Sequence, residues 1–411
     1  MSQQQGLILV VSDDQSPVFT SALGGAAFPI IQTSWAQALG AVTQTHPMAV
    51  VAAAGYDDTA RLEALATHIK AVEPYLPLIA ISPKSALPEN AIPFSQTNHN
   101  WDRLPARLRA ALRVRTLHMT VLRRLHEQTV VELDVGRVNL VRDATVLLVG
   151  RGGGYPALSV ALGERMGVVG ALSIESAAKH LNARDIDGIV LSAGFTDRVV
   201  EAFLMVLGED PRFRNLPVIA TFDGLTQNYD LPNLEVIIGE PAQVVANGLP
   251  LIRQHVIEAY LGRSLRSIDA GGLLDPHTGL LTTAAFDRDL TIAVDETLEK
   301  GGGLSVAQFT FDPTNRRAQL DGARLLSRLM RQMDFGALHD DGTALVVFAE
   351  ADLRTAHLIV RRLASVMRHT VQDRRDGRRS EPAVSIATLH PSDTTQSLLA
   401  RLNDERGRAA S

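Results

Sequence analysis

The residues whose types and spacing could bind a ligand lie in the run RQMDFGALHDDGTALVVF, from Arg331 to Phe348. Arg331 and Asp334 stand three residues apart. A planar guanidinium can donate two parallel hydrogen bonds to a guanine edge or a phosphate oxygen, and a carboxylate can accept from the N–H groups of guanine. A simple ion pair at i,i+3 spacing would have the same pattern, so both interpretations stay open.

The same run predicts a β-hairpin. Asp341-Gly342 separates two apolar stretches, and Asp-Gly in such a context is a strong signal for a two-residue type I′ turn. We therefore expect antiparallel strands on either side of the residues Asp340–Gly342.

The composition is that of packed globular domains. The chain has 411 residues, of which 45% are hydrophobic and 21% charged, and this length suits two to four domains of about 100–200 residues each. It holds no cysteine, which excludes disulfides, Cys-ligated zinc and a thiol nucleophile. The net charge of −5 gives no general attraction to nucleic acid or anionic lipid. No apolar run reaches the roughly 20 residues that cross a bilayer, and the N-terminus has the pattern of a first strand and not of a signal peptide. We therefore expect a soluble cytoplasmic protein.

Three pairs of short apolar runs recur about 140 residues apart. Each run is typical of a strand buried on both faces, and helix-length stretches such as 59–72 and 197–207 lie between them. This alternation predicts right-handed βαβ units and a doubly wound parallel sheet, so residues 1–268 are expected to hold two copies of one α/β unit. The paired runs are Leu7–Ser12 with Thr145–Gly150, Met48–Gly55 with Asp187–Gly194, and Leu76–Ser82 with Leu216–Phe222.

A helical stretch closes the first copy, from Trp101 to about Arg137. Leucines at helical spacing alternate with many arginines, which predicts an amphipathic helix with a basic, exposed face. A terminal helix packed on its own sheet and a dimerisation helix both stay open. In the second copy, Gly271-Gly272 ends the corresponding helix.

In order and length the two copies resemble the response-regulator receiver family, but without its chemistry. That family phosphorylates an aspartate at the end of the third strand, beside a Mg²⁺ ion held by acidic side chains. Ala53 and Ser192 stand at those acceptor positions, and Asp57 nearby has the pattern of a turn or helix N-cap residue. The resemblance therefore implies two interaction modules that do not accept phosphate by the usual route. The other family positions hold Asp13, Asp14 and Ser82 in the first copy and Arg151, Thr221 and Glu240-Pro241 in the second.

From Asp275 onward the chain resembles the GGDEF family, the diguanylate cyclases that condense two GTP molecules into cyclic di-GMP. The run DPHTGLLTTAAF is similar to the family's D-x-L-T-G-L-x-N-R-x-x-F motif, with Thr282-Thr283 in place of Asn-Arg. The likeness covers nearly all of 272–411 and implies an α/β domain with a mixed antiparallel sheet. The matching motif residues are Asp275, Thr278, Gly279, Leu280 and Phe286.

The catalytic residues of that family are missing. Two carboxylates occupy the first two signature positions, where glycines would let the backbone approach a triphosphate, and their charge would repel it. Thr310 stands where the first strand should carry a metal-binding carboxylate, and Asp312 is a poor substitute. Because this phosphoryl transfer needs carboxylates aligned around metal ions, we expect no cyclase activity, no metal and no cofactor. The five signature positions hold Asp340, Asp341, Gly342, Thr343 and Ala344.

The R-x-x-D pair keeps the register of the family's inhibitory product site. The resemblance therefore implies that Arg331 and Asp334 bind cyclic di-GMP. Family members carry a further arginine for this ligand in the following helix, where this chain has Arg361-Arg362. The ungapped register selects Arg362.

These patterns predict a receiver-like domain at 1–127, a helical linker at 128–143, a second receiver-like domain at 144–268 and a degenerate GGDEF domain at 269–411. The order resembles receiver–receiver–GGDEF effectors that bind cyclic di-GMP. That resemblance implies a homodimer, recruitment to a cell pole, and delivery of cell-cycle regulators to a ClpXP-type protease through an adaptor. A ligand-independent scaffold and a heterodimer partner of an active cyclase stay open. Nucleic acid is not expected as a partner because no segment of the third domain has a helix-turn-helix pattern and the net charge is negative.

Overall fold

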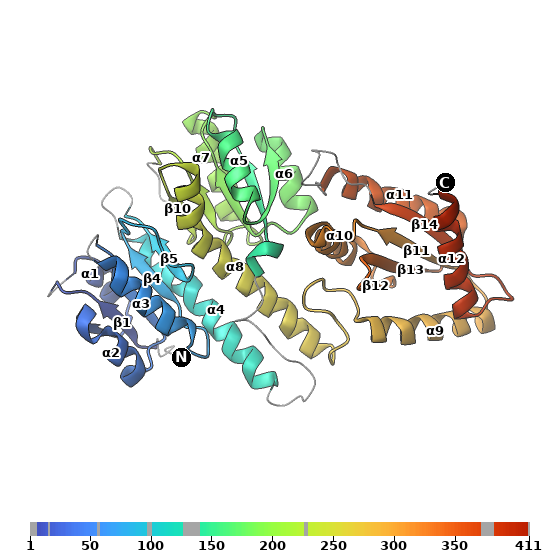
Figure 1. Cartoon of the computed structure of the whole chain (residues 1–411), viewed down its shortest axis with the longest axis horizontal. Helices are drawn as coiled ribbons and strands as arrows, with labels where there is room; N and C mark the ends of the chain where they lie inside the picture. Colours follow the sequence, from blue (N-terminus) through green and yellow to red (C-terminus); the bar gives the residue numbers. More distant parts are fainter. Residues whose placement is uncertain are drawn as a thin grey trace. The chain divides into compact units, whose positions relative to one another are not determined.

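The computed structural model describes residues 6–14, 17–55, 58–96, 101–125, 140–225, 229–370 and 382–409 (Figure 1). They form two compact units. The N-terminal unit comprises 1–178 with 186–261, and the C-terminal unit comprises 179–185 with 262–411. Within the described residues, no helix is long and apolar enough to cross a membrane.

The first sheet of the N-terminal unit is parallel, with strand order β2-β1-β3-β4-β5. Its central strands are buried on both faces, as their continuous apolar runs predicted. The order 2-1-3-4-5 is a doubly wound one. The strands are β1 (Ile8–Val11), β2 (Ile30–Thr33), β3 (Ala49–Ala53), β4 (Leu78–Ile81) and β5 (Ala91–Phe94). The helices are α1 (Phe19–Gly25), η1 (Trp35–Gln37), α2 (Ala38–Thr45), α3 (Thr59–Lys70) and α4 (Arg103–Leu125).

The second sheet repeats this winding, with strand order β10-β9-β8-β6-β7 and all strands parallel. The predicted internal repeat and the two doubly wound α/β sheets are thus confirmed. The strands are β6 (Thr145–Val149), β7 (Gly167–Ala171), β8 (Gly188–Leu191), β9 (Val218–Ala220) and β10 (Leu234–Val236). The helices are η3 (Leu140–Asp143), α5 (Tyr155–Gly163), α6 (Ile174–Ala183), α7 (Asp197–Glu209) and α8 (Pro241–Asp269). The rest of the predicted linker lies outside the described residues.

Two arginines of α4 do not lie on the exposed basic face that the sequence predicted, whereas Arg109, Arg113, Arg123 and Arg124 are exposed as expected. Arg107 is fully buried and Arg115 is 7% exposed. The guanidinium of Arg107 donates to the carboxylate of Glu235 at 3.0 Å and to the carbonyl of Leu234 at 2.8 Å, both in β10 of the second sheet. Arg115 donates to the carbonyls of Pro74 and Tyr75. These arginines are buried because acceptors from other segments satisfy their donors.

Helix α4 therefore packs on its own sheet and also joins the two copies. Leu104, Leu108 and Ala111 lie in one cluster with β1, β3, β4 and β5, and Leu251 of α8 belongs to the same cluster. Arg113 of α4 donates to Glu258 of α8 at 2.7 Å. The interpretation as a terminal helix packed on its own sheet holds for the described residues, and the same helix pairs the copies within one chain.

The C-terminal unit holds one four-stranded antiparallel sheet with order β12-β13-β11-β14. A parallel bridge from Leu281 to Ala337 is added at its edge, so the sheet is mixed as predicted. The chain order β-α-β-β-α-β with this strand order is ferredoxin-like. The strands are β11 (Leu304–Thr310), β12 (Phe335–Leu338), β13 (Thr343–Ala349) and β14 (Ala383–Thr388). The helices are α9 (Thr283–Lys300), α10 (Arg316–Leu329), α11 (Leu353–Thr370) and α12 (Thr395–Ala409).

Alternation along the strands gives this sheet two buried faces. Phe309, Val346 and Phe348 pack with α10 and α11 on one face, whereas Val306 and Val347 pack with α9 and α12 on the other (Figure 1). The sheet thus fixes where α10 ends and where the β12–β13 hairpin turns, and these two places carry the sequence-predicted site.

Candidate functional site

Arg331 and Asp334 form a bidentate ion pair between the end of α10 and the start of β12. The Arg331 guanidinium donates through Nε at 3.0 Å and through Nη2 at 2.9 Å to the two carboxylate oxygens of Asp334. The backbone N–H of Arg331 donates to the same carboxylate at 3.2 Å. Nη2 also donates to the carbonyl of Ala349 at the end of β13. The guanidinium is thus held in a fixed plane by two segments of the chain.

The two members of the pair differ in access to solvent. The side chain of Arg331 is 39% exposed, whereas that of Asp334 is fully covered. Hydrogen bonding to Asp334 raises the pKa of Arg331 further, so the guanidinium stays charged. In this arrangement Asp334 orients the arginine, and a guanine could reach the carboxylate only after Arg331 moves aside.

Arg362 lies at the same end of α10. It is an exposed residue of α11, and its Nη2 donates at 3.4 Å to the carbonyl of Leu329, the last residue of α10. Arg331 follows Leu329 by two residues. The structure therefore brings Arg331 and Arg362 to the same place, the carboxyl end of α10. Arg361 is also exposed on α11. A dianionic ligand at this end of α10 would meet cations from two elements.

The signature segment forms a hairpin turn, but not the type I′ turn that Asp-Gly predicted. That turn needs positive φ at both central residues. Here Gly342 has φ of +80° and Asp341 does not have a positive φ. The N–H of Gly342 donates to the carbonyl of His339, and the N–H of His339 donates to that of Thr343. This is a type I turn closed by a glycine bulge.

The reason for this turn type lies in the side chain of Asp341. Its carboxylate accepts from the N–H of Thr343 at 3.0 Å and from the Thr343 hydroxyl at 2.6 Å. Asp340 is exposed and Ala344 is fully buried. The signature thus holds one carboxylate that caps the turn and one that faces solvent.

The strand opposite the signature has no acidic side chain at its end. Thr310 pairs with Thr343 across the β11–β13 ladder. Asp312, just beyond β11, accepts from the N–H and hydroxyl of Thr314 and so closes its own turn. Across the described residues, no group of three or more His, Asp or Glu side chains could hold a metal ion.

The positions that the sequence resemblance to receivers singled out lie at the carboxyl ends of the parallel strands. Ala53 ends β3 and Ser192 follows β8. Asp13 is bound by the backbone N–H of Trp35 and by Arg61 at 3.0 Å, and these contacts hold its pKa below the ordinary value. The remaining positions, Asp14, Ser82, Arg151, Thr221 and Glu240, follow β1, β4, β6, β9 and β10 respectively. Asp57 lies outside the described residues.

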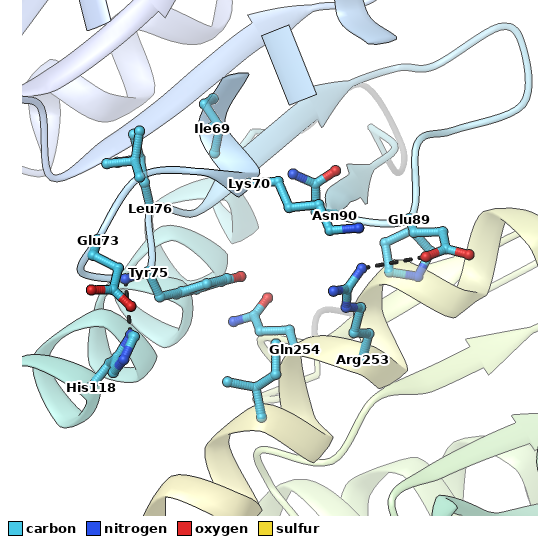
Figure 2. A pocket seen from close by; sticks show the side chains of 13 residues that line it. Ile69, Lys70, Glu73, Tyr75, Leu76, Glu89, Asn90, His118, Arg253 and Gln254 are labelled. Carbon is cyan, nitrogen blue, oxygen red and sulfur yellow. Dashed lines mark hydrogen bonds and ion pairs between the residues drawn. The ribbon is translucent and has the colours of Figure 1, made fainter. Parts of the chain in front are cut away.

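The N-terminal unit also holds a cavity of about 100 Å³ that the sequence did not predict (Figure 2). Tyr75 and Gln254 border it, and burial raises the pKa of the Tyr75 hydroxyl. Gln254 is 4% exposed, and its Oε1 has no hydrogen-bond partner among the described residues. The cavity lining carries charged side chains of both signs, namely Lys70, Glu73, Glu89 and Arg253. The space is large enough to hold an ordered water molecule that donates to Oε1 of Gln254.

His118 at this cavity predicts a pH-dependent stability. Its Nδ1 accepts from the N–H of Tyr75 at 2.9 Å, and burial holds its pKa below the ordinary value of about 6.5. The unfolded chain therefore takes up a proton before the folded one, and stability falls as pH drops from about 6.5 toward the lowered pKa. We expect urea unfolding between pH 7.5 and 5 to show a smaller loss in His118→Gln than in the wild type. His357→Gln, at an exposed histidine of α11, is the control, and equal loss in all three would contradict the assignment.

Comparisons with known proteins found similar solved structures. No family model matches the sequence, and no curated protein matches it. One similar structure is the coiled coil and GGDEF domain of DgcB from Caulobacter crescentus in complex with c-di-GMP, with 17% identity and a TM-score of 0.31 over 36% of this chain and 87% of that one. Another is a sensory box/GGDEF family protein from Caulobacter crescentus CB15, with 22% identity and a TM-score of 0.28 over 34% and 99%. The FimX GGDEF domain from Pseudomonas aeruginosa has 18% identity and a TM-score of 0.28 over 32% and 90%.

Proposed function

We propose that this protein is a catalytically inactive GGDEF-type receptor for cyclic di-GMP. The observation that carries the proposal is the convergence of Arg331 and Arg362 on the carboxyl end of α10. The ligand has two phosphates and two guanines, and both kinds of group accept hydrogen bonds from guanidinium. The sequence register before the hairpin supports the same assignment.

The fixed position of Arg331 favours binding. Asp334 and the Ala349 carbonyl hold its guanidinium in one plane while part of it remains exposed. A group that is already oriented loses less conformational freedom on binding. Asp334 would act first by orienting the arginine, and would contact guanine only where Arg331 swings away.

Titration calorimetry with cyclic di-GMP tests the proposal. We expect micromolar or tighter binding to the full chain. The complete Arg331–Asp334 ion pair favours a second candidate function, a ligand-independent scaffold in which this pair is structural. An absence of heat at ligand concentrations up to the millimolar range would favour the scaffold.

We expect no cyclic di-GMP to form when the protein is incubated with GTP and Mg²⁺. Asp340 adds negative charge where a triphosphate would lie, and Thr310 with Thr343 offers hydroxyls where metal carboxylates are needed. Chromatography of the reaction mixture measures the product, with an active diguanylate cyclase as the positive control. Product above the level of a protein-free blank would overturn the inactivity.

The effector role follows from the order of the domains. Two receiver-like domains with Ala53 and Ser192 at the acceptor positions, followed by a degenerate GGDEF domain, resemble PopA, a cyclic di-GMP effector. We propose that the protein forms a homodimer. This homodimer would act in the cytoplasm through protein partners, such as a protease adaptor or a polar scaffold. A heterodimer with an active cyclase is the alternative, and light scattering with and without such a cyclase distinguishes the two assemblies.

A further inference from the structure

Four arginines line one cavity of the C-terminal unit, outside the proposed cyclic di-GMP site. The cavity measures about 240 Å³. Arg263 and Arg266 come from the last turns of α8, and Arg324 and Arg328 come from α10. Their spacings of three and four residues place each pair on one face of its helix. The other lining residues are Asp185, Leu274, Thr278, Gly279 and Ser327.

Two of the arginines are anchored by the loop that joins α8 to α9. Arg263 donates through Nε to the carbonyl of Pro276 at 2.7 Å, and Arg324 donates through Nε to the carbonyl of His277 at 2.9 Å. Arg324 is 8% exposed. Since consecutive carbonyls hold one arginine from each helix, both guanidinium groups have defined positions at the wall of the cavity.

Arginines outnumber acids among the described residues that line the cavity. Among the described residues that line it, Asp185 is the one acid, and it pairs with Arg328 at 3.5 Å. Arg266 is exposed, and its side chain makes no hydrogen bond or ion pair to a described residue. Four guanidinium groups and one carboxylate thus line this partly enclosed space. Like charges at short range repel one another, and the repulsion is relieved by an anion with several acceptor oxygens.

The volume indicates the size of that anion. Liquid water occupies about 30 Å³ per molecule, so the cavity has room for roughly eight water molecules. A diphosphate group fits within this space and presents oxygens in several directions, which suits planar donors arriving from two helices.

We propose that this cavity binds a diphosphate group, either inorganic or carried by a nucleotide. The site goes beyond the proposed function, because Arg331, Asp334 and Arg362 do not line it. Both sites nevertheless depend on α10, which carries Arg324 and Arg328 and ends two residues before Arg331. Occupation of the cavity would fix this helix against the last turns of α8.

Titration calorimetry of the full chain with pyrophosphate, orthophosphate and GDP tests the proposal. We expect pyrophosphate to bind at least tenfold more tightly than orthophosphate, and its affinity to fall as salt rises. Equal affinities for pyrophosphate and GDP would assign recognition to the diphosphate alone, whereas tighter GDP binding would show that the nucleoside also contributes. No heat with millimolar pyrophosphate would overturn the site.

Variants locate the binding. The double variant Arg266→Gln/Arg328→Gln leaves the loop-anchoring arginines in place, and we expect it to weaken pyrophosphate binding at least tenfold. The matched control Arg288→Gln/Arg354→Gln removes the same charge from exposed positions of α9 and α11, and should bind as the wild type does. Equal weakening in both doubles would overturn the site. Loss of pyrophosphate binding in Arg331→Ala would also overturn it, whereas failure of cyclic di-GMP binding alone would leave it standing.

Discussion

Replacing Arg331 with alanine is expected to weaken cyclic di-GMP binding at least about 100-fold, which corresponds to about 2.7 kcal/mol. The variant removes the exposed guanidinium that Asp334 and the Ala349 carbonyl hold in place. Two charge-assisted hydrogen bonds from the N–H groups of Nη1, which Asp334 and Ala349 leave unused, contribute about 1.5–3 kcal/mol each, so a loss of this size follows. Arg331→Lys keeps the charge but loses the fork and should bind with intermediate affinity. Calorimetry with the three proteins measures the series.

A second variant separates binding from folding. Arg331→Ala leaves the covered carboxylate of Asp334 with only the backbone N–H of residue 331 as a donor from this pair, so some stability is lost as well. Arg362→Ala removes the other guanidinium without touching Asp334. We expect it to reduce affinity at least tenfold while the thermal unfolding midpoint stays unchanged. If a folded Arg331→Ala protein bound cyclic di-GMP as tightly as the wild type does, the receptor proposal would be wrong.

Replacing Arg107 with methionine is expected to lower the free energy of unfolding of the N-terminal unit by about 3–5 kcal/mol. Glu235 is 1% exposed and accepts from Arg107 at 3.0 Å and from the N–H of Ser95 at 2.6 Å. Burial lowers the pKa of Arg107 to about 10, and the nearby Glu235 opposes this, so the guanidinium stays charged at neutral pH. Without its partner, the Glu235 charge would remain buried and only partly compensated. Urea denaturation of the full chain measures the loss.

Two control variants test whether the loss of stability comes from the buried ion pair. The double variant Arg107→Met/Glu235→Leu removes both charges and should recover most of the lost stability, because apolar side chains can replace a buried pair. Arg113→Met breaks the more exposed pair with Glu258, in which the arginine side chain is 42% exposed, and should cost no more than about 1 kcal/mol. If Arg107→Met costs no more than Arg113→Met, the buried pair does not hold the two copies together.

Local patterns in the sequence were enough to predict the sheets. Runs such as Val146–Val149 and Val50–Ala52 are apolar at every position, and such runs need cover on both faces wherever they lie in the chain. The recurrence of those runs predicted the repeat, and the hairpin strands around Asp340–Gly342 followed from their apolar residues. These properties depend on neighbours along the chain, so they can be read without coordinates.

The turn type and the surroundings of the arginines depended on contacts that no local pattern contains. The Asp341 carboxylate reached Thr343 and set a type I turn with a glycine bulge. Arg107 is buried because Glu235, 128 residues away, supplies its partner, although the sequence predicted a basic, exposed face for this helix. In the same way, the spacing of Arg331 and Asp334 allowed a ligand site or an ion pair. Only the tertiary structure decided that the carboxylate is covered, that the guanidinium is exposed, and that Arg362 reaches the same helix end. Burial of a charge is set by which distant segments donate or accept beside it, and for that reason the sequence could name these residues but not their surroundings.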